Sequence, residues 1–272
     1  GAMGMSVLRR FVHCFLCLGM IIFNAGVLAQ DKPAIVIIID DMGYDKTLGQ
    51  RAIDLPGALT FSFLPYAPFT PELAKNAFSH GKDVLAHIPM QSFEPKNLGK
   101  DGLTWAMGKS ELTEKLIAQI AEVPHAIGMN NHMGSLLTQD RESMQWVVAA
   151  LQGSTTEGMF FLDSRTTKYT VAEAVAFESG LATARRDVFF DHTDDEQVIK
   201  EQFQSLVSLA KEKGFAIGIG HPKRNTLKVL LEVLSQLDDY GVVLVPLSKQ
   251  LLKKLPIPEP LQSSGDGSTT HK

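Results

Sequence analysis

Aspartate and histidine side chains follow the ends of short apolar runs along this chain. Asp40 and Asp41 come directly after the run 34–39, His87 follows a third run, and His132 comes shortly after a fourth. One carboxylate and two neutral imidazoles are a common ligand set for catalytic Zn²⁺, with one position left open for water. A second carboxylate beside such a set is free to act as a general base. The pattern therefore favours a metal-dependent hydrolase.

The two adjacent aspartates would repel each other at the end of a buried strand. Like charges at this separation raise the pKa of one carboxyl group unless a cation or a hydrogen-bond donor compensates. A divalent metal bound by one aspartate, with the other left free, is the simplest compensation. Two alternatives stay open: one of the aspartates caps the following helix, or His87 only hydrogen-bonds a loop.

More acidic and imidazole residues occupy equivalent places farther along the chain. Asp163 and Asp191 follow directly after later apolar runs, and His221 follows another after one glycine. In a parallel α/β barrel the carboxyl ends of all strands lie on one face, where active sites form. These side chains, although distant in sequence, are therefore expected to converge on a single cleft.

The elements that must position these residues are short strands separated by helices. Eight apolar runs, too short for helices, alternate with amphipathic stretches of helical period. The runs are 34–39, 59–64, 83–86, 126–129, 159–162, 188–190, 215–219 and 242–245. Such alternation predicts an α/β fold with a parallel sheet covered by helices, here a closed or nearly closed barrel of seven or eight strands. An open doubly wound sheet is the alternative, but the Gly-rich phosphate loop common in such sheets is missing after Ile39.

Several residues mark expected helix boundaries. Thr193 and Glu196 have the spacing of a capping box at the start of a helix. Gly214 and Gly241 follow helical stretches, where glycine commonly ends a helix in a left-handed conformation. We therefore expect helices to begin near Thr193 and to end before each of these glycines.

The two ends of the chain differ in composition from the region between them. Residues 1–4 precede Met5 and are interpreted as an expression scar. Residues 5–29 have a basic start, an apolar core and small residues before Gln30, which predicts a cleaved signal peptide; an uncleaved membrane anchor is the alternative. Residues 255–272 are rich in Pro, Ser and Gly, which predicts a disordered tail. Residues 30–254 would then form one exported, periplasmic domain without a stable membrane anchor.

The net charge bears on possible partners, and the cysteine content bears on how the domain is stabilised. The chain has 26 Lys and Arg against 30 Asp and Glu, a formal net charge of −4, and loss of the leader would remove Arg9 and Arg10. An acidic chain without a basic run argues against nucleic acid as a partner. Cys14 and Cys17 both lie in the predicted leader, so the domain must depend on a hydrophobic core and not on disulfides.

Five short segments carry a resemblance to a known family. They are IIDDMG (38–43), HIPM (87–90), NNHMGS (130–135), LDSRT (162–166) and GIGHP (218–222). In this order they resemble the divergent polysaccharide deacetylases of bacteria, which are related to the NodB-like carbohydrate esterases. The resemblance spans nearly all of residues 34–248 and implies a distorted (β/α) barrel.

The resemblance also implies roles for individual residues. Asp40 would be the catalytic base, Asp41 a metal ligand and His221 the general acid. His87 and His132 would complete the metal site, whereas classical relatives take both histidines from one short turn. Four further residues are candidates for substrate contact: Asn131, Asp163, Arg165 and Asp191.

These residues together support the hypothesis of metal-assisted hydrolysis of an N-acetyl group on a cell-envelope glycan. Zn²⁺ is the expected metal, with Co²⁺, Ni²⁺ or Mn²⁺ as alternatives. Phe61, Phe63, Tyr66 and Trp105 are aromatic candidates for stacking on sugar rings, although core packing would equally account for each of them. Two other functions stay open: a non-catalytic periplasmic protein of the same fold that binds a glycan or a cell-wall enzyme, and a different metal hydrolase such as a phosphoesterase.

Overall fold

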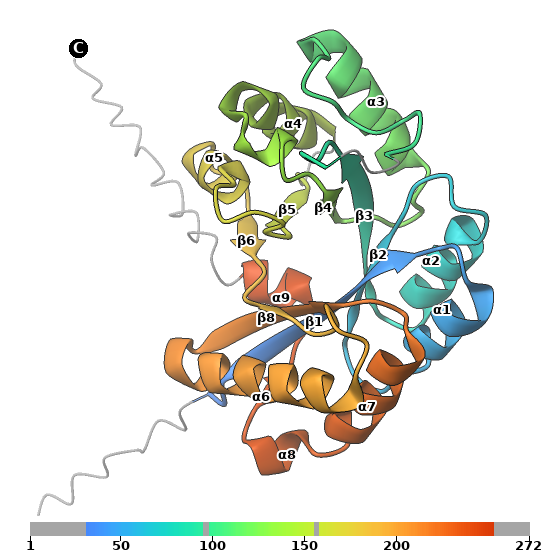
Figure 1. Ribbon diagram of the computed structural model, residues 1–272, viewed down its shortest axis with the longest axis vertical. Coiled ribbons are helices and arrows are strands. Elements are labelled where there is room, and N and C mark those ends of the chain that lie inside the picture. The colour runs from blue at the N-terminus through green and yellow to red at the C-terminus, as the bar shows by residue number, and fades with distance from the viewer. Residues whose placement is uncertain (1–30, 95–97, 155–157, 253–272) are drawn as a thin grey trace, which may run out of the picture. The chain divides into compact units, whose positions relative to one another are not determined.

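The fold is built on one curled parallel sheet (Figure 1). The computed structural model describes residues 31–94, 98–154 and 158–252 of the 272-residue chain. Within them, strands pair in the order β6-β5-β4-β3-β2-β1-β8-β7, and β9 pairs with β1 beside this path. All these pairings are parallel. The strands are β1 (Ala34–Met42), β2 (Thr60–Phe63), β3 (Asp83–Met90), β4 (Gly128–Met133), β5 (Phe160–Asp163), β6 (Thr183–Arg185), β7 (Val188–Phe189), β8 (Phe215–Gly220) and β9 (Val243–Leu244).

Helices follow most of the strands and cover the outer surface of the sheet. Figure 1 shows α3, α4 and α5 beside β3, β4 and β5, and α6 beside β8 and β1. A short 3₁₀ turn, η1 (Leu137–Gln139), follows β4. The helices are α1 (Lys46–Ile53), α2 (Thr70–Ser79), α3 (Lys109–Ala121), α4 (Arg141–Ser154), α5 (Ala172–Glu178), α6 (Glu196–Lys213), α7 (Arg224–Leu234), α8 (Leu237–Tyr240) and α9 (Leu247–Leu252).

The alternation of side chains along the strands produces two apolar layers. Ile37 and Phe61 belong to the layer between the sheet and the surrounding helices. Val36, Ile38 and Ile217 belong to the second layer, which fills the inside of the curled sheet. Because alternate residues of a strand share a face, the next inward position of β1 after Ile38 is occupied by an aspartate, Asp40. The inside of the sheet thus changes from apolar to polar towards its carboxyl end.

Helix α9 contacts the amino ends of the central strands. Leu247 and Leu251 pack into the inner apolar layer. The backbone N–H of Ser248 donates to Asp83 Oδ2 at 2.8 Å, and Asp83 is the first residue of β3. Side chains of this helix therefore fill part of the interior at the amino ends of the strands.

The barrel is nearly closed, as the sequence predicts, but its last gap is bridged by the chain itself. No strand pairing joins β6 to β7 within the described residues, and only Arg186 and Asp187 separate these two strands along the chain. The N–H of Arg186 donates to Asp163 O at 2.9 Å, and the N–H of Asp187 donates to Ile217 O at 2.8 Å. Asp163 belongs to β5 and Ile217 to β8, so these two residues connect both edges of the sheet.

The predicted alternation of strands and helices is confirmed with two corrections. Each predicted run overlaps a strand, but the pattern does not predict β6, whose only apolar residue is Ala184. Helix α6 is capped by Asp195, whose side chain accepts from Val198 N, and not by Thr193. Gly214 ends α6 with a φ of 90°, as expected.

The predicted scar (1–4), signal peptide (5–29) and tail (255–272) lie outside the described residues. These predictions therefore stay predictions. Among the helices that the structure does describe, none has the length and apolar character needed to cross a membrane.

Candidate active site

Two consecutive aspartates at the end of β1 line the same pocket. Regular alternation would place Asp40 and Asp41 on opposite faces of the sheet. The pairing of β1 with β2 shifts register between Ile39 and Met42, and Asp41 has a left-handed backbone conformation with a φ of 54°. This irregularity turns Asp41 towards the inside, so that both carboxylates reach the pocket.

Asp41 meets two histidines from neighbouring strands. Asp41 Oδ1 lies 3.1 Å from His87 Nε2 and 2.9 Å from His132 Nδ1, and the two nitrogens are 3.1 Å apart. Ligands around a tetrahedral Zn²⁺ with bonds of about 2.0–2.2 Å are separated by a similar distance, about 3.3 Å. Although both nitrogens are near, Asp41 Oδ1 is buried without a hydrogen-bond partner in the described part of the chain. The donor types, the spacing and this unsatisfied oxygen fit a divalent metal.

Asn130 fixes the tautomer of His87. Asn130 Nδ2 donates to Asp40 Oδ1 at 2.8 Å, so the other amide atom, Oδ1, is the one that faces His87 Nδ1 at 2.7 Å. An amide oxygen only accepts, so His87 Nδ1 must carry a proton and donate it. In the neutral imidazole this leaves the Nε2 lone pair directed at the other two ligand atoms. Outer hydrogen bonds of this kind orient histidine ligands in metal sites.

Burial and neighbouring charges give the two aspartates different acidities. Burial raises the pKa of Asp40 above its ordinary value, although His87 and His221 oppose it. Burial alone would also raise the pKa of Asp41, but its contacts with His132 and His87 hold it well below the ordinary value. Asp40 is therefore the better proton acceptor, and Asp41 is the ionised ligand.

His221, directly after β8, is held in place by Asp191. Asp191 Oδ1 accepts from His221 Nδ1 at 2.8 Å, and Oδ2 accepts from the backbone N–H of His221 and from Thr226 Oγ1. His221 Nε2 then faces the pocket, 3.6 Å from Asp41 Oδ2. Burial tends to lower the pKa of His221, but the hydrogen bond and charge of Asp191 raise it overall. The protonated imidazolium is thereby favoured.

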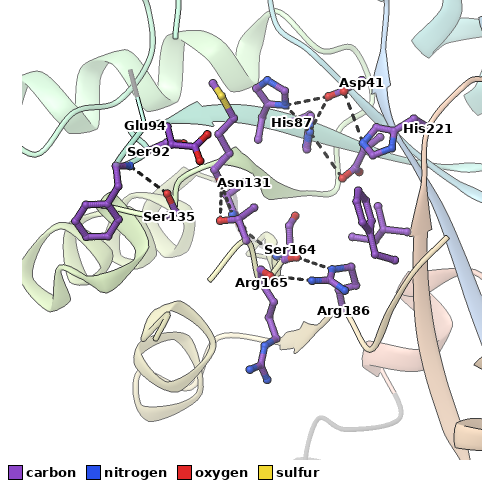
Figure 2. A pocket seen from close by; sticks show the side chains of 17 residues that line it. Asp41, His87, Ser92, Glu94, Asn131, Ser135, Ser164, Arg165, Arg186 and His221 are labelled. Atoms are coloured by element: carbon purple, nitrogen blue, oxygen red, sulfur yellow. Dashed lines mark hydrogen bonds and ion pairs between the residues drawn. The ribbon is translucent and has the colours of Figure 1, made fainter. Parts of the chain in front are cut away.

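These groups lie on one side of a pocket of about 620 Å³ (Figure 2). Binding pockets for small molecules usually measure about 300–1,000 Å³, so this pocket can hold one or two sugar units. Two phenylalanines and two arginines are also among its lining residues: Phe93, Phe189, Arg165 and Arg186. In Figure 2, Asp41, His87 and His221 gather on one side, with Arg165 and Arg186 on another.

A sequence family described as divergent polysaccharide deacetylase matches residues 37–251, which include every element of this site. The chain belongs to that family. The resemblance found in the five segments is therefore confirmed, and so is the predicted α/β barrel.

Relatives of this deacetylase-family protein occur in several bacteria. An uncharacterized protein of Haemophilus influenzae is 33% identical over 233 residues, covering 86% of this chain and 81% of that protein. The uncharacterized protein YibQ of Escherichia coli is 34% identical over 217 residues, covering 78% of this chain and 67% of YibQ. The crystal structure of uncharacterized protein ATU2773 from Agrobacterium tumefaciens has a TM-score of 0.77 and 20% identity, covering 82% of this chain and 90% of that one. The last likeness is one of fold.

Two residues predicted to contact substrate in this deacetylase-family protein do not line the pocket. Asp191 is fully buried beneath His221 and positions that imidazole. Asp163 is 1% exposed; its carboxylate accepts from the N–H of Arg165 and from Thr170 Oγ1, which orders the loop after β5. Neither carboxylate is available to contact a substrate, because each is buried and already accepts hydrogen bonds from donors of the chain.

The other two predicted contact residues do line the pocket, in different ways. The Asn131 side chain accepts from Ser164 N at 2.9 Å and donates to Met133 O at 2.7 Å, so it mainly links the ends of β4 and β5. Arg165 lies at the rim, and Figure 2 shows its side chain directed away from the aspartate and histidine cluster.

Asn130, and not its neighbour Asn131, contacts the chemical groups directly. Asn130 is fully buried and pairs in register with His87 across β3 and β4. Ser62 Oγ donates to the same oxygen that accepts from His87. Alternation along β4 could have found Asn130, because it shares a strand face with His132 while Asn131 does not.

The aromatic prediction is wrong for two residues. Phe61 and Phe63 are fully buried in the layer between sheet and helices, so they cannot stack on a sugar. Tyr66 and Trp105 are exposed but are not among the residues that line the pocket. Phe93, at the pocket wall and 64% exposed, is the better candidate, although no sequence pattern singles it out.

Proposed function

We propose that this protein is a metal-dependent polysaccharide deacetylase that hydrolyses the N-acetyl groups of a cell-envelope glycan. Membership in the deacetylase family supports the reaction class. The observation that carries the proposal is the convergence, in one pocket, of three ligand atoms with a buried carboxylate and a carboxylate-oriented histidine. Metal-assisted amide hydrolysis needs these three components.

Asp41, His87 and His132 would hold the metal. When bound, a divalent cation supplies a Lewis acid that acidifies water and polarises the acetyl carbonyl. Zn²⁺ is the metal we propose, because one carboxylate and two imidazoles are among its usual catalytic ligands. The same donors also accept Co²⁺, Ni²⁺ and Mn²⁺.

Asp40 is proposed to accept the proton from the attacking water. Its carboxylate has one fixed donor, Asn130 Nδ2 on Oδ1, and Oδ2 lies 3.7 Å from His87 Nε2. Burial raises its pKa, so it is a stronger base than an exposed aspartate. A catalytic base is most effective when its pKa approaches the working pH.

His221 is proposed to protonate the departing nitrogen. An amide nitrogen leaves poorly as an anion, so a proton must reach it as the C–N bond breaks. Asp191 holds the imidazole with Nε2 towards the pocket and favours its protonated form. Water thus adds to the carbonyl carbon and loses one proton to Asp40, and the His221 imidazolium gives its own proton to nitrogen as the C–N bond breaks. Acetate and a free amine result, and the proton on Asp40 passes back to His221.

We also propose that the protein acts in the periplasm. This proposal is supported by the composition of residues 5–29, which is that of a secretory signal peptide. A cell-envelope glycan would then be present in the same compartment.

Acetate release is the direct test. Purified protein, stripped of metal and reloaded with Zn²⁺, is incubated with N-acetylated chitooligosaccharides and with peptidoglycan glycan strands, and acetate is measured enzymatically. We expect release from the reloaded protein and a loss of about 10²–10⁴-fold in the isosteric Asp40→Asn variant. The Arg51→Gln variant, altered on helix α1 away from the pocket, is the matched control.

The outcome also decides between the proposal and the non-catalytic alternative. Folded, Zn²⁺-loaded protein that binds these glycans but releases no acetate would be a glycan-binding protein. Equal release by the Asp40→Asn variant and the parent would contradict the assigned base.

A further inference from the structure

A second hollow, of about 450 Å³, adjoins the active pocket. Its lining residues are Arg165, Lys168, Arg185, Arg186, Asp187 and Leu209. Arg165 and Arg186 line both hollows, so the two adjoin at these side chains. We call the four basic side chains of this hollow the cationic trough.

Within the described residues, most cations of the cationic trough form no salt bridge. Arg185 lies 3.6 Å from Glu173, but the other three side chains form no salt bridge with any described carboxylate. Asp187, the one acid that lines the hollow, is already paired with Lys213. The chain as a whole has more acidic than basic residues, so its composition does not explain four cations in one place.

Backbone carbonyls fix the guanidinium group of Arg186 in spite of the positive charge of Arg165. Arg186 donates from Nε to Ser164 O at 2.7 Å and from Nη2 to Arg165 O at 2.8 Å. Its group is thereby fixed against the turn that carries Arg165. Burial and the positive charge of Arg165 lower the pKa of Arg186 overall, although the charges of Asp163, Asp40 and Asp187 oppose this shift. An anion bound beside the two arginines would offset their positive charge, and planar guanidinium groups match the geometry of a carboxylate.

The trough begins close to the catalytic groups. Phe189 contacts both groups: the guanidinium carbon of Arg186 is 5.4 Å from the centre of its ring, and the His221 ring meets the same ring edge-on at 5.4 Å. Arg186 and His221 are therefore neighbours of one aromatic ring.

We propose that the cationic trough binds the carboxylates of an acidic glycan, next to the sugar whose N-acetyl group lies at the aspartate and histidine cluster. This inference rests on the proposed function, because it takes that cluster as the reacting centre. A polymer with repeated charges fits the observations better than a small anion, because Arg165 and Arg186 line both hollows, whereas Lys168 and Arg185 line the second hollow but not the active pocket. The trough then selects acidic over neutral acetylated glycans.

The test compares one glycan with and without its charges. Peptide-free peptidoglycan strands, which carry a lactyl carboxylate on alternate sugars, are used with the carboxylates free or methyl-esterified. Binding is measured by calorimetry in the Zn²⁺-loaded Asp40→Asn variant, so that no turnover occurs. We expect the free acid to bind about tenfold more tightly than the ester, as charge-assisted hydrogen bonds imply. High ionic strength should reduce this preference.

Two double variants test whether the cationic trough causes the preference for the free acid. The double variant Arg165→Gln, Lys168→Gln removes two charges from the trough, and it should lower the preference to less than about threefold. The double variant Arg51→Gln, Lys75→Gln removes the same charges from helices α1 and α2 and should keep it. Circular dichroism and thermal melting establish that each variant is folded. Arg186 is left unchanged because its carbonyl contacts belong to the fold.

Three outcomes would overturn the inference: equal binding of acid and ester, an equal loss in both double variants, or tighter binding of a phosphorylated chitooligosaccharide than of the carboxylated strand. Acetate release by the parent protein is recorded separately. A carboxylate preference without acetate release would contradict the proposed function and leave the trough assignment standing. Acetate release without a preference for the free acid would support the proposed function and contradict the trough assignment.

Discussion

Asn130 is the residue whose replacement most sharply tests the proposed metal site. Its amide joins a metal ligand to the base: it accepts from His87 Nδ1 and donates to Asp40 Oδ1. The Asn130→Leu variant removes both contacts at similar volume. The Asn130→Asp variant keeps the acceptor for His87 and replaces the donor to Asp40 with a second carboxylate.

The two variants should separate metal binding from catalysis. In Asn130→Leu, His87 loses the contact that fixes its tautomer, and we expect Zn²⁺ affinity to fall about 10–100-fold. Buried groups of Ser62, His87 and Asp40 also lose a partner, at a cost of about 1–3 kcal/mol of unfolding free energy each. In Asn130→Asp, Zn²⁺ affinity should be kept or increased, because a carboxylate orients a ligating imidazole well. The new charge should raise the pKa of Asp40, so the acidic limb of the rate profile should move to higher pH.

Zn²⁺ affinity is measured by competition with a chromophoric chelator, unfolding by urea titration, and the pH profile by acetate release. The Ser62→Ala variant is the matched control, because it removes one hydrogen bond to the same amide oxygen without touching His87 or Asp40. We expect it to lose about 1 kcal/mol of stability and no metal affinity. A folded Asn130→Leu variant that binds Zn²⁺ as tightly as the parent would falsify the tautomer assignment.

Three further predictions concern the same cluster. Burial alone would lower the pKa of His87, but the charges of Asp40 and Asp41 raise it to about 9 in metal-free protein. Because Zn²⁺ must displace this proton, the apparent Zn²⁺ affinity should rise by up to about tenfold per pH unit until about pH 9. A Zn²⁺ affinity that does not depend on pH would contradict this. The Asp191→Asn variant should lower the pKa of His221, so the alkaline limb of the rate profile should move to lower pH, and the rate should fall about 10²–10⁴-fold. The Asp41→Ala variant should bind no stoichiometric Zn²⁺ by elemental analysis while its far-ultraviolet circular dichroism stays that of the parent.

The residues at the strand ends were predictable because two simple regularities apply. The carboxyl ends of parallel strands meet on one face, which brings Asp40, His87, His132 and His221 together. Alternation then decides which neighbour points inwards, and it assigns Asn130 to the face of His132. Asn131, which the motif suggests, also lines the pocket, but it contacts neither aspartate nor histidine of the cluster through a described hydrogen bond. The strand order supplies the remaining fact, that β3 and β4 pair with His87 opposite Asn130.

The contribution of Arg186 could not be derived from alternation. This residue lies between β6 and β7, where no strand pairing among the described residues fixes a face, and β6 itself is too short to be recognised from its sequence. Its position depends on hydrogen bonds to the backbone carbonyls of Ser164 and Arg165, which come from the loop after β5. Only the three-dimensional closure of the barrel brings these segments together. The cationic trough could not be predicted from the sequence for the same reason.

Backbone strain identifies the same region of the fold without reference to any side-chain chemistry. Five described residues other than glycine have a positive φ, and three of them line the active pocket: Asp41, Met133 and Arg165. They lie at or just beyond the ends of β1, β4 and β5. Each such conformation costs about 1 kcal/mol or more and persists only where the surroundings enforce it. At Asp41 the strained conformation brings the carboxylate to the two imidazoles, because an unstrained strand would direct it to the opposite face of the sheet.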